Sequence, residues 1–116
     1  MDNTQDKKSE LKLNKVTKVV NAKVKGSFTP EDANYFVTEY MKIVNQIDAK
    51  EYELTFDCTE LRVSTQDMVP MLSGCFEMYK KDGFKKVTFD CGSNAALRMQ
   101  VNRVARMTEL QLFEIL

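Results

Sequence analysis

Histidine and tryptophan are absent from this chain of 116 residues, and its four glycines are scattered singly. Without histidine the chain lacks the side chain most often used for proton transfer near neutral pH, which is also the commonest metal ligand. Without a glycine-rich loop it lacks the usual backbone cradle for phosphate groups. No set of nucleophile, base and acid stands out among the remaining residues. The sequence therefore predicts a protein that is not an enzyme and that uses no cofactor or metal.

An excess of charge of either sign is also missing, as are long apolar runs. Seventeen lysines and arginines balance seventeen aspartates and glutamates, so the chain has no general attraction to nucleic acid or to an anionic membrane. No apolar stretch approaches the ~20 residues that a membrane-spanning helix needs, and the polar first ten residues carry no export signal. We therefore expect a cytoplasmic protein that binds neither nucleic acid nor membrane.

The three cysteines, Cys58, Cys75 and Cys91, are odd in number and widely spaced. This pattern favours reduced, buried thiols over a disulfide framework. No CxxC pair is present and no histidine is available to lower a thiol pKa, so neither a zinc-binding nor a catalytic role is expected.

Apolar and polar residues alternate in five short segments, which predicts five strands. The segments lie near residues 11–13, 20–24, 54–58, 87–89 and 112–116. Asn14-Lys15 between the first two could form the turn of a hairpin, or the break could be a bulge in one long strand. The third segment is expected to enter a turn at Thr59-Glu60.

Apolar residues at three- and four-residue spacing predict three helices. The first is expected over about residues 30–47, with Thr29 as its N-cap and Pro30 at its first position. The second begins after Ser64 or Thr65 and ends at Gly83. The third follows a turn and cap over residues 92–94.

Helices and strands alternate through the last two-thirds of the chain, so those strands should be parallel and joined by right-handed crossovers. The expected fold is α/β, with a mixed sheet of about five strands and three helices. An N-terminal antiparallel hairpin precedes a parallel βαβαβ unit. One domain is expected over residues 11–116, after a disordered polar tail over residues 1–10.

Three local segments, in this order of elements, carry a family resemblance. They are Val24-Lys25-Gly26-Ser27-Phe28, Leu54-Thr55-Phe56-Asp57-Cys58-Thr59-Glu60-Leu61, and Val104-Ala105-Arg106-Met107-Thr108-Glu109-Leu110 followed by Phe113. The first resembles the glycine-terminated strand before the first helix of STAS domains, the fold of anti-sigma-factor antagonists. The second resembles that family's strand ending in aspartate, and the third its last helix. The resemblance covers about residues 11–116.

The resemblance implies a small cytosolic switch protein that docks on another protein, such as an anti-sigma factor or serine kinase. In the family, phosphorylation of a serine at the start of the second helix turns docking off. Here that region reads Val63-Ser64-Thr65-Gln66-Asp67-Met68, without the family's Asp-Ser-Ser-Gly. An ungapped alignment from Asp57 places Gln66 near the modified serine, and a shorter loop makes Ser64 and Thr65 the phosphorylation candidates.

Both candidates have a plainer interpretation, because serine and threonine at a helix start commonly serve as caps, worth about 1 kcal/mol. Asp57 and Asp90 raise a similar alternative. Carboxylates at the ends of parallel strands could hold Mg²⁺, but aspartate is also frequent where a turn begins.

Basic residues gather in two places. Arg98, Arg103 and Arg106 fall in the third helix, and lysines 80, 81, 85 and 86 flank the end of the second. Either group could meet an acidic partner or a phosphate, although a solvated helix face is the more usual explanation.

The first functional hypothesis is a non-catalytic regulatory domain that docks through the start of its second helix. The residues expected to bind the partner are Arg62, Ser64, Thr65, Gln66, Asp67, Met68 and Met71. The alternative is a small-ligand or lipid-binding module with the same fold, which would need a pocket. STAS domains typically add a closing helix after the last strand. A sheet edge left uncovered without that helix could pair with a second copy of the chain, so a homodimer is a further candidate assembly.

Overall fold

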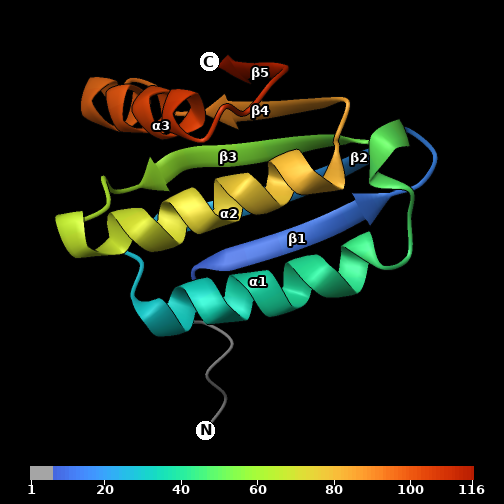
Figure 1. Ribbon diagram of the computed structural model, residues 1–116. Helices are drawn as coiled ribbons and strands as arrows, with labels where there is room; N and C mark the ends of the chain where they lie inside the picture. Colours follow the sequence, from blue (N-terminus) through green and yellow to red (C-terminus); the bar gives the residue numbers. More distant parts are fainter. Residues whose placement is uncertain (1–6) are drawn as a thin grey trace, which may run out of the picture.

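The computed structural model describes residues 7–116 and forms a five-stranded sheet with three α-helices (Figure 1). In chain order the elements are β1 (Ser9–Asn14), β2 (Val19–Gly26), α1 (Pro30–Val44), the short 3-10 helix η2 (Ala49–Glu51), β3 (Glu53–Leu61), the 3-10 helix η3 (Gln66–Met68), α2 (Val69–Asp82), β4 (Lys86–Asp90), α3 (Ala95–Met107) and β5 (Phe113–Ile115). None of the helices within residues 7–116 is long and apolar enough to cross a membrane.

The strands lie in the sheet in the same order as in the sequence, β1-β2-β3-β4-β5. β1 and β2 form an antiparallel hairpin, and every other pair is parallel. The predicted α/β fold with a mixed sheet and three helices is therefore confirmed, and of the two interpretations of Asn14-Lys15 the hairpin is the correct one.

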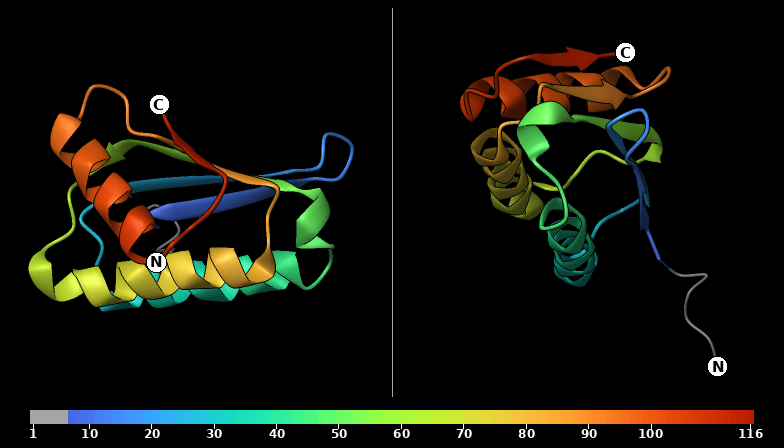
Figure 2. Two further views of the ribbon diagram at one scale, coloured as in Figure 1. Left: turned by 45° about the horizontal axis from the view of Figure 1, so that its top comes forward. Right: turned by 90° about the vertical axis from the view of Figure 1, so that its right-hand side faces the viewer.

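All three helices cover the same face of the sheet (Figure 2, right). Each parallel connection moves to the next strand in the same direction, and right-handed crossovers then place every helix on one side. The opposite face carries the polar residues of the alternation, among them Asn21, Lys23, Thr55 and Thr88. The hydrophobic core therefore lies wholly between the sheet and the helical layer.

Aromatic rings fill the centre of that core. Phe56 of β3 stacks on Phe89 of β4 with ring centroids 5.2 Å apart, and Phe76 of α2 stacks on Phe89 at 5.1 Å. Tyr79 of α2 contacts Phe36 of α1 edge-on at 6.5 Å. Each such pair contributes about 0.5–1.5 kcal/mol beyond the burial of its surface. The rings thus join α1 and α2 to the two central strands.

α1 ends earlier than the sequence predicts. Its start agrees with the prediction, because Thr29 and Asp32 form a reciprocal capping box and Pro30 lies in the first turn. The helix ends at Val44 rather than at residue 47, since the next amides bond three residues back, as in Ile47 N–H to Val44 C=O at 3.2 Å. This tighter turn leads into η2, whose N-cap is Asp48.

β3 does not turn at Thr59-Glu60, so that prediction was wrong. The strand continues to Leu61 because a bulge shifts its pairing with β2: Lys23 is opposite Asp57, but Lys25 is opposite Glu60. The Asp57 carboxylate accepts the Thr59 backbone N–H at 3.0 Å and the Thr59 hydroxyl at 2.7 Å. The first of these bonds satisfies the Thr59 N–H at the bulge, and the strand continues beyond it.

The N-terminal strand begins at Ser9, two residues before the predicted start of the domain. Lys8 already accepts a backbone hydrogen bond from Lys25 N–H at 3.0 Å, and its ammonium group pairs with Asp32 at 3.1 Å. Residues 1–6 of the predicted tail lie outside the described residues.

A partly buried hydrogen bond joins α1 to the far end of α2. The Tyr40 hydroxyl donates to the Asp82 carboxylate at 2.6 Å, and the Tyr40 side chain is almost fully buried. Burial, together with this bond, raises the pKa of Tyr40, so the phenol keeps its proton.

Replacing Tyr40 with phenylalanine removes only the hydroxyl and should lower the free energy of unfolding by about 1.5–3 kcal/mol, the usual range for a bond to a charged group. Urea denaturation measures the loss. The matched control is Tyr35→Phe on the same helix, because Tyr35 is only half-buried and its ring, which phenylalanine keeps, is the part that the Lys7 ammonium contacts at 5.1 Å. Equal stabilities for the two variants would contradict a stabilising role for this bond.

Candidate functional site

The segment from Arg62 to Met71 connects β3 to α2 and divides into an outer and an inner set of residues. Arg62, Thr65, Gln66 and Asp67 are exposed. By contrast, Met68 is buried, and Ser64 and Met71 are half-buried. The residues expected to bind a partner therefore do not form one uniform surface. Sequence reasoning missed the neighbouring exposed apolar side chain, Val63, which is 41% exposed.

The middle of this segment is held by a side chain from α3. Gln100 accepts the Ser64 backbone N–H through Oε1 at 2.8 Å and donates from Nε2 to the Ser64 carbonyl at 2.9 Å. The Arg62 N–H also donates to the Gly26 carbonyl at 3.0 Å. We call the paired Gln100 bonds the Gln100 clasp. No sequence pattern signals it, because the partners lie 36 residues apart.

Neither Ser64 nor Thr65 caps a helix as predicted. Thr65 occupies the N-cap position of η3 but makes no side-chain capping bond, and α2 begins only at Val69. The clasp holds the Ser64 backbone before the helical turn begins. A hydrogen bond from Thr65 instead lowers the pKa of the neighbouring Asp67 carboxyl, which favours the ionised form.

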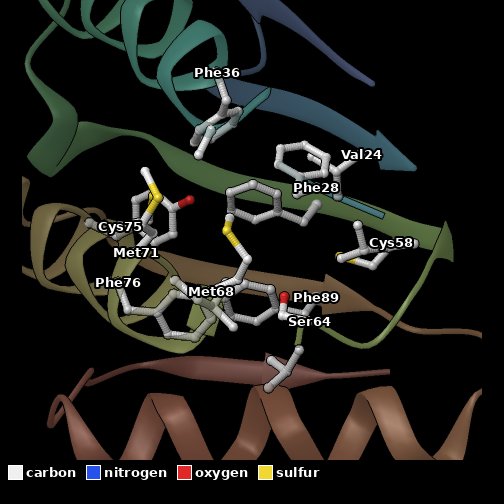
Figure 3. Close-up of a pocket in the computed structure, with 16 residues that line it drawn as sticks. Val24, Phe28, Phe36, Cys58, Ser64, Met68, Met71, Cys75, Phe76 and Phe89 are labelled. Carbon is white, nitrogen blue, oxygen red and sulfur yellow. The ribbon is translucent and has the colours of Figure 1, made fainter. Parts of the chain in front are cut away.

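An apolar pocket lies beneath the same segment, between α1, α2 and the sheet (Figure 3). Its volume is about 80 Å³. Met68, Met71 and Cys75 line it from η3 and α2, while Phe28 and Phe36 line it from the side of β2 and α1. Ser64 also lines it, so the serine side chain belongs to the pocket whereas Thr65 faces solvent.

The cysteines behave as parts of the core. All three are free, with Cys58 and Cys91 buried and Cys75 half-buried. A hydrogen bond with the Cys91 thiol, together with burial, raises the pKa of Cys58, and burial raises the pKa of Cys75 to about 11. Protonated thiols are poor nucleophiles, so Cys58 and Cys75 contribute little reactivity at neutral pH.

Asp57 and Asp90 are direct neighbours across β3 and β4, on the face of the sheet that no helix covers. Each carboxylate already accepts a local hydrogen bond: Asp57 accepts the Thr59 N–H at the bulge of β3, and Asp90 accepts the Gly92 N–H at 3.0 Å in the turn after β4. No group of three or more histidine, cysteine, aspartate or glutamate residues within 7–116 could hold a metal ion. Asp90 thus has the turn-forming role that the sequence offered as an alternative to Mg²⁺, whereas Asp57 stabilises the bulge within β3.

The basic groups are also partly engaged near their own elements. The Arg98 guanidinium donates to the Gly92 carbonyl, and Arg106 donates to Asn102 at 3.2 Å. Lys80 donates to the Thr108 carbonyl at 3.2 Å, which ties α2 to the end of α3. Arg103 is exposed.

Shortening Gln100 to alanine should lower the free energy of unfolding by about 1–3 kcal/mol, because the Ser64 N–H and C=O lose their partners together. Urea denaturation of Gln100→Ala measures this. The control is Gln111→Ala, since the exposed Gln111 makes only a local bond at 3.3 Å. A Gln100→Ala variant as stable as this control would show that the clasp does not hold the loop.

Comparison with models of known protein families finds no match to this chain, and comparison with curated proteins finds none either.

Proposed function

We propose that this chain is a non-catalytic regulatory domain that docks on a protein partner through the exposed residues Arg62, Val63, Thr65, Gln66 and Asp67, here called the docking loop. The observation that best supports this proposal is the Gln100 clasp, which holds Ser64 at the centre of the loop. A loop fixed before binding loses less conformational entropy when a partner arrives. Fixing one flexible backbone residue costs about 1–2 kcal/mol, so pre-ordering favours affinity.

The composition of the docking loop suits a protein surface. Val63 provides a partly exposed apolar contact, and the same exposed segment carries one positive and one negative side chain, Arg62 and Asp67. An apolar centre with a polar surround is typical of protein interfaces. The resemblance to anti-sigma-factor antagonists supports the same location and suggests an anti-sigma factor or serine kinase in the cytoplasm as the partner.

A phosphorylation switch at this loop would act on Thr65 rather than on Ser64. Thr65 is exposed, whereas Ser64 is clasped through its backbone and lines the apolar pocket. A phosphate on Thr65 would add about −1.5 to −2 charges close in sequence to Asp67, a carboxylate that is ionised at neutral pH. Repulsion between these charges, and the loss of the Thr65 hydrogen bond, would change both the shape and the charge of the docking loop.

The test is capture of partners from a lysate of the native host by immobilised wild-type protein and by Thr65→Glu, read by quantitative mass spectrometry. A captured protein is then purified and its affinity measured by calorimetry. We expect Thr65→Glu to bind it at least about tenfold more weakly, equivalent to about 1.4 kcal/mol. Thr17→Glu, at the exposed tip of the hairpin, is the control. A partner that binds all three proteins equally would contradict docking through this loop.

The apolar pocket favours a second candidate, a small-ligand or lipid-binding module. At about 80 Å³ it is smaller than the ~300–1,000 Å³ of sites for drug-sized ligands. Protein docking therefore remains the first proposal.

A further inference from the structure

We propose that the apolar pocket receives one aliphatic side chain, a leucine, isoleucine or methionine, from the protein that binds the docking loop. This inference rests on the proposed function and assigns the pocket as the anchor point of the same interface. The binding energy of an interface concentrates at side chains seated in well-packed, desolvated pockets, and an aliphatic anchor is one of the groups that fill them.

The size of the pocket selects an occupant of a few carbon atoms. Its volume is about 80 Å³, roughly half that of an engineered cavity of about 150 Å³ that admits one benzene molecule. A group of about three or four carbons, such as the end of a leucine side chain, matches that space. A long lipid chain does not.

The walls of the pocket select an apolar occupant. Two thioethers, from Met68 and Met71, and the rings of Phe28 and Phe36 face the space. The lining also contains the Tyr79 hydroxyl, which is already engaged in an interaction with the Cys75 thiol. Water is held poorly in such a cavity because it finds too few hydrogen-bond partners. Flexible methionines can also adjust to aliphatic groups of slightly different shape.

The position of the pocket ties it to the docking loop. The pocket is lined by residues on both sides of the loop and within it. Leu61 precedes the loop, Ser64 lies inside it, and Met68 follows it. The half-buried residues Phe28, Leu61 and Met71 form its more accessible side. Farther along the helices, α1 and α2 are joined by the bond between Tyr40 and Asp82. A protein seated on the loop therefore lies beside the open part of the pocket.

Filling the pocket from inside should abolish anchoring without altering the loop. Ala33 of α1 lines the pocket and is only 5% exposed, so Ala33→Leu places a new aliphatic side chain in the space. Cys75→Met fills it independently from α2. Asn34→Leu, at an exposed position next to Ala33, is the matched control. Circular dichroism and thermal unfolding establish that each variant is folded.

The probe is a library of short random peptides displayed on phage and selected on the wild-type protein. We expect selected peptides to contain a leucine, isoleucine or methionine whose change to alanine weakens binding at least about tenfold. The same peptides should lose at least about tenfold in affinity for both Ala33→Leu and Cys75→Met, and should keep their affinity for Asn34→Leu.

A further variant, Arg62→Glu, separates this inference from the proposed function. Peptides that are weakened by Arg62→Glu but unaffected by Ala33→Leu and Cys75→Met would preserve docking and overturn the anchor. Peptides indifferent to all of these changes, or a selection that yields no binder, would overturn both. A fluorescent long-chain fatty acid that binds the wild type but not Ala33→Leu would assign the pocket to a lipid and overturn the anchor.

Discussion

Right-handed crossovers between strands that lie in sequence order place all three helices on one face of the sheet (Figure 2). The helices then stand side by side, with α2 between its neighbours (Figure 2). This arrangement lets Gln100 of α3 reach the loop before α2, while the pocket lies beneath α2 and is lined from α1, α2, the sheet and Val101 of α3.

The candidate site combines a fixed loop backbone with an apolar pocket, and both lie next to α2. On the α3 side, the Gln100 clasp fixes the backbone of the docking loop. On the α1 side, the Tyr40–Asp82 bond joins α1 to the C-terminal end of α2. Near the N-terminal ends of these helices, small and flexible side chains, including Ala33 and Met71, leave space for the pocket. A rigid loop beside an adaptable pocket is a combination suited to recognising a protein surface.

The sequence predicted those features that local chemistry determines. The cap at Thr29, the cap at Asn94 and the left-handed glycine at Gly83 all depend on a few neighbouring residues, and all occur as expected. The bulge in β3 and the clasp on Ser64 escaped prediction because each depends on residues distant in the chain. The predicted capping by Ser64 or Thr65 failed for the same reason. The pocket depends on how α1 and α2 pack, which periodicity alone does not specify.

In the unbound protein the docking loop is already ordered, because Gln100 holds the Ser64 backbone. Amide hydrogen exchange of the wild-type protein, followed by NMR, tests it most directly at Ser64, whose N–H is held by Gln100. We expect this amide to exchange at least about tenfold more slowly than in an unstructured peptide of the same sequence, since exchange requires the clasp to open. Exchange at the rate of the free peptide would contradict it.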